Sequence, residues 1–345
     1  MTNNNQSFTV GKLKHKYLAR MLKDFASDLI NQDKRVIIGS KIGEDAAVID
    51  MGNKYLIAKT DPITFTTNEI GYYAVNVNVN DVVCMGAKPK WFQSTILLPE
   101  NGTTIELIEK IFKSIYDACK VMDISVVGGH TEISLGLERP IVIGSLLGEV
   151  EKEKLVLTSG AEPGDALVLT KGVFIEGTSI IGREKEHVLV KKEYSSDFIE
   201  KCKNYLYHPG ISVFKEALLA NQHFHIKSMH DPTEGGLATG IAEMAMNSDT
   251  GVMIERSKID ILPEPLELSR IFNLNPLNTL SSGSLLIAIN DDYSFELIKL
   301  LKKNNISAEK IGEFISKEKG LMIKDRDGRI NPLKYSETDE ITKIL

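Results

Sequence analysis

Five short segments of this chain each place an acidic residue beside small or turn-forming neighbours. They are Gly-Glu-Asp-Ala-Ala-Val at 43–48, Thr-Asp-Pro at 60–62, Asn-Asp-Val-Val-Cys-Met-Gly-Ala-Lys-Pro at 80–89, Gly-Gly-His-Thr-Glu at 128–132 and His-Asp-Pro-Thr-Glu-Gly-Gly at 230–236. Mg²⁺ prefers hard oxygen ligands and keeps several waters, so one or two carboxylates per ion suffice. Converging carboxylates repel one another unless cations neutralise them. As a set, the segments favour magnesium coordination on a polyphosphate.

The glycines in these segments suit the same chemistry. A glycine lets backbone N–H groups approach phosphate oxygens, because it carries no side chain. Gly235 and Gly236 stand at the expected start of a helix, where the helix dipole favours an anion. The sequence therefore predicts backbone contacts to phosphate as well as carboxylate contacts to metal.

Each motif alone also has a purely structural interpretation. Gly43-Glu-Asp45 is typical of a solvated turn, and Asp61 before Pro62 could shape another. Thr233 could cap a helix, and His130 could be a hydrogen-bonded structural residue. Only the combination of the segments argues for a site.

The chain divides into two halves that must position these segments. A run rich in turn formers, Ser-Gly-Ala-Glu-Pro-Gly-Asp at 159–165, follows a charged stretch, and we place the domain boundary here, giving domains 1–155 and 156–345. The second half is expected to open with a buried strand at 166–170 and to contain helices at 214–219 and 295–301.

Two segments of the first half differ in how clearly their apolar patterns predict a helix. Thr103 and Glu106 form a capping-box pattern before an apolar stripe at helical spacing, from Ile108 to Met122 and including Phe112. The segment 74–80 alternates Val and Asn with period two, which is typical of a strand. Its valines at 75, 79, 82 and 83 equally fit one face of a helix, so periodicity alone leaves both open.

The overall composition excludes some classes of protein. The 345 residues carry a net charge of −6 with scattered basic residues, which argues against a nucleic-acid binder. The polar start is unlike a signal peptide, and the apolar runs are too short for a membrane span. Three widely spaced cysteines are typical of a reducing compartment. We therefore expect a cytoplasmic protein without a membrane role.

Taken in order, the segments resemble the superfamily of aminoimidazole ribonucleotide (AIR) synthase, or PurM. Its members include the hydrogenase maturation protein HypE, thiamine-monophosphate kinase, selenophosphate synthetase and formylglycinamidine synthase. The similarity covers nearly the whole chain, and Asp-Pro-Thr-Glu-Gly-Gly at 231–236 is most similar to HypE-like, AIR synthase-related proteins.

The resemblance implies an α+β fold of two domains. The N-terminal domain would hold a four-stranded sheet with helices on one face, and two such sheets would pair across a homodimer into a β-barrel. The C-terminal domain would be an α/β sandwich, with ATP in a cleft between the domains. The segment around Asn80 and Asp81 would be helical.

The resemblance also implies a set of site residues. The magnesium ligands would be Asp45, Asp61, Asp81, Glu132 and Asp231. The ATP contacts would include Lys12, Gly43, Asp45, Asn80, Gly128, Gly129, Thr233 and Gly235. Asp231, His130 and Glu176 are the candidate catalytic residues, with Glu176 and Thr178 on the acceptor side of the cleft.

The sequence departs from the family pattern at two places. His130 stands where relatives often carry an acid, and a neutral imidazole is a poor magnesium ligand, so Glu132 could replace it. Typical HypE proteins end in a cysteine that carries the group being dehydrated, whereas no cysteine follows Cys202 here. Self-modification at a C-terminal thiol is therefore not expected.

These observations leave three hypotheses for function. The first is an enzyme that uses ATP and magnesium to phosphorylate and so activate an oxygen, of an amide or carboxamide, on a small-molecule or protein-borne acceptor. The second is a small-molecule kinase similar to thiamine-monophosphate kinase. The third is a nucleotide-binding accessory protein without turnover.

Overall fold

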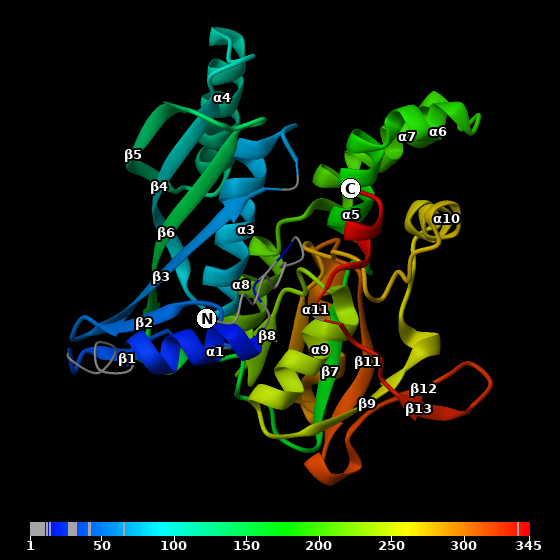
Figure 1. Ribbon diagram of the computed structural model, residues 1–345. Coiled ribbons are helices and arrows are strands. Elements are labelled where there is room, and N and C mark those ends of the chain that lie inside the picture. The colour runs from blue at the N-terminus through cyan, green and yellow to red at the C-terminus, as the bar shows by residue number, and fades with distance from the viewer. Residues whose placement is uncertain are drawn as a thin grey trace, which may run out of the picture.

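The computed structural model describes residues 11, 13, 15–26, 33–40, 43–64, 66–336 and 338–345. In these residues each half of the chain builds one β-sheet (Figure 1). The first sheet has six strands in the order β1-β2-β3-β6-β4-β5, and the second has seven in the order β13-β12-β9-β11-β7-β10-β8. Helices and sheets are thus mixed in both halves, as the α+β prediction requires.

The first sheet is formed by residues before 152. Its strands are β1 (Val36–Ile38), β2 (Ala47–Asp50), β3 (Lys54–Ile63), β4 (Lys88–Pro99), β5 (Ser125–Ser134) and β6 (Ile141–Glu151). All neighbouring strands are antiparallel except the parallel pair β4 and β5. The prediction of four strands was too low, and among the described residues of this one chain the sheet stays open, with β1 and β5 at its edges.

Two long helices cover this sheet. They are α3 (Ile70–Cys84) and α4 (Ile105–Val121), and α1 (His15–Met21) lies at the N-terminal end. Thr104, and not Thr103, caps α4, because its side chain accepts a hydrogen bond from the Leu107 N–H at 3.2 Å. Phe112 of the predicted apolar stripe is exposed, whereas Ile111, Ile115 and Cys119 are buried.

Helix α3 settles the ambiguous valine and asparagine segment in favour of a helix. Figure 1 shows it between the first sheet and the second half, so it is buried all round and cannot show the one-sided apolar pattern of a surface helix. Gly144 and Gly148 on β6 allow its close approach, because a Cβ at Gly144 would lie 2.4 Å from the Asn78 amide and one at Gly148 2.5 Å from Val82.

The second sheet and its helices come from the rest of the chain. The strands are β7 (Asp165–Thr170), β8 (Ser228–His230), β9 (Gly251–Glu255), β10 (Leu286–Asn290), β11 (Ala308–Ile315), β12 (Leu321–Lys324) and β13 (Ile330–Pro332). The helices are α5 (Ile175–Glu184), α6 (Glu186–Lys191), α7 (Ser196–Asn204), α8 (Phe214–His223), α9 (Gly236–Asn247), α10 (Pro263–Phe272) and α11 (Ser294–Lys303). The predicted strand at 166–170 and helices at 214–219 and 295–301 are confirmed.

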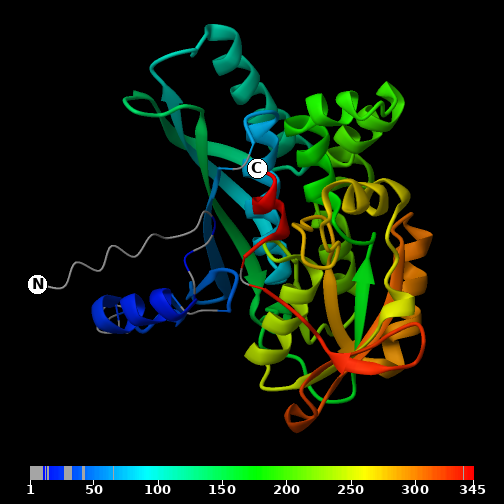
Figure 2. The same cartoon turned by 45° about the vertical axis from the view of Figure 1, so that its right-hand side comes forward.

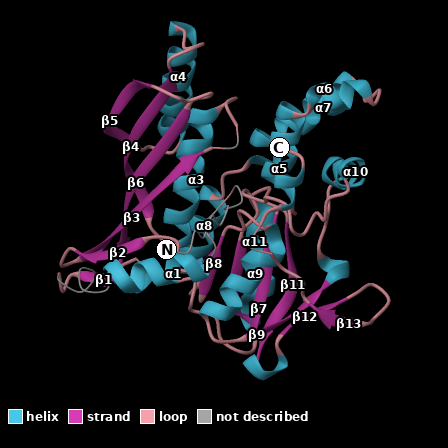
Figure 3. Cartoon of the chain, in the orientation of Figure 1, coloured by secondary structure: helices cyan, strands magenta, loops and turns pink. Residues whose placement is uncertain are grey.

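Helices pack on both faces of this second sheet. Figure 2 shows α9 and α11 on opposite sides of its strands, and Figure 3 gives the same arrangement by element type. Strand β7 lies in the middle of the sheet and is buried throughout, which accounts for its apolar sequence. In the part of the chain that the structure describes, no helix combines the length and apolar character needed to cross a bilayer.

Candidate active site between the two halves

The C-terminal half of α3 brings three polar side chains to the second half. Asn80 is fully buried, and its side-chain amide makes hydrogen bonds to two backbone groups of the segment before α8. Its Nδ2 donates to the Ile211 carbonyl at 2.8 Å, and its Oδ1 accepts from the Val213 N–H at 2.9 Å. An amide suits this place because it carries both a donor and an acceptor. This clamp fixes Asp81 and Cys84 against the second half.

Strand β3 supplies a lysine and an aspartate on its core-facing side. Lys59 and Asp61 follow the buried Ile57, and precede the buried Ile63, at intervals of two residues, so all four side chains lie on the same face of the strand. The Lys59 ammonium lies 2.8 Å from Asp81 Oδ2 and 3.2 Å from Asp61 Oδ2. Two of the predicted magnesium ligands therefore meet at one cation.

The loop before β2 carries Asp45 and is tied to the second half. Glu44 accepts hydrogen bonds from the Thr158 N–H at 3.2 Å and from the Ser159 hydroxyl at 2.7 Å. The Thr158 hydroxyl donates to Asp45 Oδ2 at 3.1 Å, and the Asn247 amide donates to the Gly43 carbonyl at 2.8 Å. We call these contacts of residues 43–45 the loop latch.

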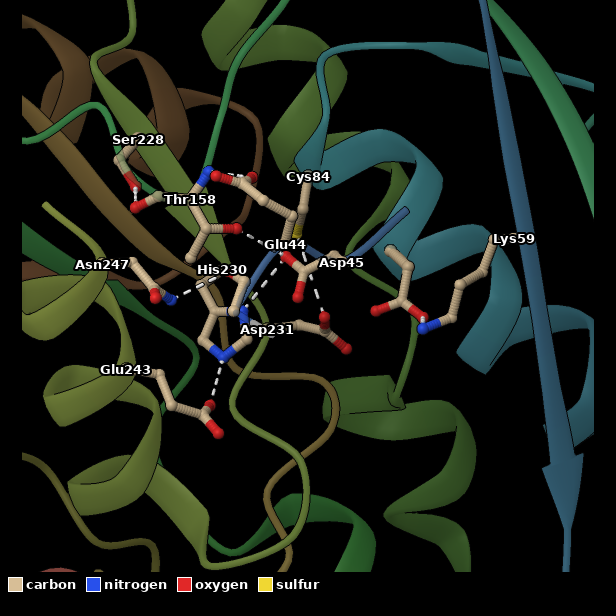
Figure 4. A network of polar contacts seen from close by, with 12 residues as sticks. Glu44, Asp45, Lys59, Cys84, Thr158, Ser228, His230, Asp231, Glu243 and Asn247 are labelled. Carbon is tan, nitrogen blue, oxygen red and sulfur yellow. Dashed lines mark hydrogen bonds and ion pairs between the residues drawn. The ribbon is translucent and has the colours of Figure 1, made fainter. Parts of the chain in front are cut away.

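His230 joins this loop to α9. Its Nδ1 lies 3.1 Å from Asp45 Oδ2 and its Nε2 lies 2.9 Å from Glu243 Oε2 (Figure 4). Burial alone would lower the pKa of His230, but the two carboxylates outweigh it and raise the pKa well above its usual value. A protonated imidazole can donate to both acids at once, and it fixes the position of Asp45.

Asp231 completes the cluster from the second half. The Cys84 thiol lies 4.0 Å from its Oδ1, while its buried Oδ2 has no hydrogen-bond partner among the described residues. Figure 4 shows Asp45, His230 and Asp231 converging from the two halves of the chain. A buried carboxylate oxygen without a partner marks a place where a ligand or ion would be stabilising.

The cluster holds more negative charge than its cations neutralise. Burial raises the pKa of Asp231 to about 7, against the lowering effect of His230. Burial also raises the pKa of Asp81 well above its usual value, although Lys59 opposes this. Burial would lower the pKa of Lys59, but Asp81 and Asp61 raise it, so this ammonium stays charged. For Asp45, the charges of His230 and Lys59 outweigh burial and lower the pKa.

The chemistry of these donors fits a magnesium ion. Among the residues that the structure describes, no three His, Cys, Asp or Glu side chains converge closely enough to hold a metal on their own. Magnesium does not need three protein ligands, because waters and phosphate oxygens fill its other positions. The orphaned oxygen of Asp231 and the incompletely neutralised Asp81 are the hard donors that such an ion prefers.

A cavity of about 300 Å³ opens beside this cluster. It is bounded by Gly11, Asp61, Pro62, Ile63, Thr64, Thr66, Val77, Glu176, Ile180, Thr233, Glu234, Leu280 and Ser282. Two of the predicted site residues, Glu176 and Thr233, thus share a cavity wall with Asp61. Thr178, two residues further along α5, is buried, and its hydroxyl donates to the Phe174 carbonyl instead of reaching the cavity.

The predicted phosphate contact at Gly235 has a partner within the chain. Gly235 is the N-terminal cap of α9, with a left-handed φ of 81°, and a Cβ there would lie 2.4 Å from the Thr239 hydroxyl. Its N–H donates to Asp339 Oδ2 at 2.7 Å, so a carboxylate already occupies the anion position at this helix start. Lys12, the other predicted phosphate contact near the cleft, lies outside the described residues.

The predicted residues at 128–132 lie elsewhere in this chain. Strand β5 is an edge strand, and the strand register runs from Asp61 across β6 and β4 to Gly129. Three strand spacings of about 4.8 Å separate Gly129 from Asp61. His130 and Glu132 are both exposed there, with His130 Nε2 3.2 Å from Glu132 Oε2. Within one chain they do not join the carboxylate cluster.

Sequence reasoning did not single out several residues of the cluster. Lys59 was missed, although a lysine two positions before Asp61 on a strand must share its face. His230 was quoted within a motif without a role, and Glu243 and Thr158 carry no local signal. The sequence indicates Ser282 and Gly283 only as a turn before a strand, without a role, and the folded chain brings Ser282 to Glu176.

Comparisons with known proteins show the family of this chain. The family model of the AIR synthase related protein N-terminal domain matches residues 43–150, and that of the C-terminal domain matches residues 162–324. A hydrogenase expression/formation protein of Methanocaldococcus jannaschii is 29% identical over 322 residues, covering 90% of this chain and 92% of that protein. The selenide, water dikinase of the same organism is 26% identical over 333 residues, covering 92% and 93%.

Solved structures show the same fold. The hydrogenase maturation protein HypE in complex with ATP aligns with a TM-score of 0.70 at 20% identity, covering 97% of this chain and 98% of that one. AaThiL complexed with AMPPCP and TMP aligns with a TM-score of 0.72 at 21% identity, covering 95% and 99%.

Proposed function

Because this chain belongs to the AIR synthase related protein family, we propose that it is an enzyme that uses ATP with magnesium to activate an oxygen atom on an acceptor. The acceptor oxygen would belong to an amide or carboxamide. The observation that carries the proposal is the meeting of Asp45, Asp61, Asp81 and Asp231, from both halves, around Lys59 and His230 beside a cavity.

The proposed chemistry assigns each part of the cluster a task. Asp61, Asp81 and Asp231 would hold magnesium, which neutralises phosphate charge during transfer. Lys59 keeps Asp61 and Asp81 together, and His230 keeps Asp45 in place. Burial excludes water and strengthens these electrostatic interactions. The relative HypE was solved with ATP, which supports the choice of nucleotide.

We also propose that the working form is a homodimer joined along β5. In the part of the chain that the structure describes, this edge strand pairs with a neighbour on one side only. Apolar side chains are exposed beside it, notably Tyr116, Val127, Ile133 and Leu135. A second copy placed there would continue the sheet into the barrel that the family resemblance implies. It would also bring Gly128, Gly129, His130 and Glu132 to a partner instead of leaving them in solvent.

Calorimetric titration with Mg-ATP tests the proposal. The native protein should bind Mg-ATP, and the double variant Asp61→Ala/Asp81→Ala should bind at least about tenfold more weakly, because two carboxylates for the metal are lost. Asp197→Ala, which removes an exposed carboxylate on α7, is the matched control and should bind normally. Circular dichroism checks that the double variant folds, and undiminished binding by it would refute the proposal.

A second candidate function is phosphorylation of a small molecule. The similarity to AaThiL, solved with AMPPCP and TMP, and the cavity of about 300 Å³ beside Asp61 favour it. Product analysis distinguishes the two functions. A phosphorylated acceptor that accumulates with ADP supports the kinase, whereas free phosphate released with a modified acceptor supports oxygen activation.

A further inference from the structure

Lys59 lies between two of the carboxylates that are proposed to hold magnesium. Its ammonium is 2.8 Å from Asp81 Oδ2 and 3.2 Å from Asp61 Oδ2, so one cation contacts both acids. Among the described residues, no other lysine, arginine or histidine comes within 4.0 Å of either carboxylate. Converging carboxylates need a cation between them, and here the protein itself supplies it.

The lysine and its two acids lie on regular elements instead of loops. Lys59 and Asp61 share one face of β3, and their backbone pairs with Leu146 and Gly144 of β6. Asp81 lies on the buried helix α3, and its side chain is 8% exposed, against 19% for that of Lys59. A lysine in solvent exchanges partners freely, whereas this one is enclosed between the strand and the helix that carry its acids.

The rest of the cluster leaves a free metal ion few ligands. His230 already bridges Asp45 Oδ2 at 3.1 Å and Glu243 Oε2 at 2.9 Å (Figure 4). Asp231 is then the one acid of the cluster without an ionic partner within 4.0 Å in the described part of the chain. Magnesium dehydrates reluctantly, so a single carboxylate holds it weakly unless phosphate oxygens join it.

We infer that Lys59 makes the nucleotide-free site select against a free divalent ion, so that magnesium enters only as its complex with ATP. A free ion would place two positive charges beside the ammonium and compete with it for Asp61 and Asp81. Magnesium on ATP comes with phosphate charges that exceed its own, and these attract the ammonium instead of repelling it. The role of ATP rests on the proposed function, whereas the exclusion of the free ion does not.

Titration with Mn²⁺, followed by electron paramagnetic resonance of the unbound ion, tests this exclusion on the nucleotide-free chain. Lys59→Met should bind Mn²⁺ at least about tenfold more tightly than the native protein, because Asp61 and Asp81 lose their internal cation. Structural damage alone would weaken binding, so a gain in affinity identifies the competition. Native protein that binds free Mn²⁺ as tightly as Lys59→Met would overturn the inference.

Three further variants assign the effect to the lysine and its acids. Lys59→Met/Asp61→Asn should lose the gain, because the ion then has one carboxylate fewer. Lys59→Arg keeps the charge and should bind Mn²⁺ as weakly as the native protein. Lys54→Met, on the same strand and beside the half-exposed Glu149 and Glu151, is the matched control and should leave Mn²⁺ binding unchanged. An equal gain in the Lys54 variant contradicts the inference.

Thermal unfolding keeps the test decisive if Lys59→Met is too unstable to titrate. An ion that binds only the folded state raises the melting temperature. Millimolar Mg²⁺ should therefore raise the melting temperature of Lys59→Met and leave that of the native protein nearly unchanged. Equal shifts in the two proteins would reject the competition.

Failure of the inference is distinguishable from failure of the proposed function. Mg-ATP is titrated into the native protein in a separate experiment. Native protein that binds Mg-ATP, and also binds free Mn²⁺ as tightly as Lys59→Met, rejects only the role of Lys59. The expected gain in Lys59→Met without Mg-ATP binding by the native protein supports the exclusion of the free ion and rejects the proposed activity.

Discussion

At the level of single residues, Lys59 is the counter-charge around which the acids of the first half are arranged. It contacts Asp61 and Asp81 directly, and its ammonium also lowers the pKa of Asp45. Removing one partner of a buried charge pair leaves the other charge uncompensated, which costs far more than the pair contributes.

Lys59→Met should therefore lower the free energy of unfolding by about 3–5 kcal/mol. Adding Asp81→Asn should recover a large part of this loss, because the uncompensated carboxylate is then absent. Urea unfolding of the two single variants and the double variant measures the coupling. Lys54→Met, which removes a half-exposed partner of Glu149 and Glu151, is the control and should cost less than about 1 kcal/mol. Equal losses for the two lysines would contradict the assigned role.

Glu176 gives a pH-dependent prediction. Its pKa rises from 4.5 to about 7 on folding, because burial disfavours the charged form, and this corresponds to about 3 kcal/mol. The folded state keeps this stabilisation below pH 4.5 and loses it as the pH rises through 7. Glutamine has no such charge, so Glu176→Gln should gain stability relative to the native protein between pH 5 and pH 8.

Thermal unfolding at the two pH values measures this gain. Glu109→Gln, at an exposed position of α4, is the control and should show no comparable trend. A difference between Glu176→Gln and the native protein that stays constant from pH 5 to pH 8 would show that Glu176 is not buried in its charged form.

The candidate site could be predicted from the sequence only where a residue carries its own signal. Asp45, Asp61, Asp81 and Asp231 lie in distinctive motifs beside glycine or proline. Their neutralising partners have no motif, because a lysine on a strand or a histidine before an aspartate is common in any protein. Ser282 could be recognised only as part of a turn before a strand, because its neighbour Glu176 is brought to it by the folded chain alone.

At the level of elements, α3 shows why the pattern of valine and asparagine was ambiguous. A helix buried on every side has no solvent-facing stripe, so helical periodicity disappears from its sequence. Its asparagines are buried too, and they bond to carbonyls of the helix itself or of other segments. Family resemblance, and not periodicity, identified it as a helix.

The loop latch at 43–45 gives a prediction with a matched pair of glycines. Gly43 and Gly52 both have left-handed φ values, 94° and 96°, so alanine strains the backbone at either position by about 1–2 kcal/mol. Only at Gly43 does the added Cβ meet a neighbour, 2.1 Å from the Asn247 side chain, whereas nothing lies within 4 Å at Gly52. Gly43→Ala should therefore destabilise the protein more than Gly52→Ala.

Chemical unfolding of both variants compares the two costs. In an Asn247→Ala background the clash is absent, so Gly43→Ala and Gly52→Ala should then cost about the same. If the two costs are already equal in the native background, Asn247 does not hold the loop that carries Asp45.

At the level of the whole molecule, the exposed apolar side chains beside β5 predict a specific assembly. A lysine in place of Tyr116 or Val127 would place a charge in the proposed dimer interface and should dissociate it. Sedimentation should then change from the dimer to the 38.3 kDa chain. Val190→Lys, an exposed apolar position on α6, is the control and should leave the assembly intact. Native protein that sediments as a single chain would reject the dimer.

The turn-forming residues at 159–165 predict where one half ends, and this boundary stays a prediction. The contacts that join the two halves have no comparable signal in the sequence. The hydrogen bonds across the joint connect residues up to 204 positions apart, such as Asn247 and Gly43, and no local pattern encodes a contact of that range.

Asn80 and Asp45 differ in how freely their neighbours can be exchanged. Asn80 binds the backbone of 211–213, which any sequence supplies, so a chimaera with a relative's second half keeps this contact without adjustment. Asp45 binds the His230 imidazole and the Thr158 hydroxyl, which the donor must happen to carry. Grafted proteins would then assemble correctly yet leave Asp45 misplaced, and restoring these two side chains would repair them.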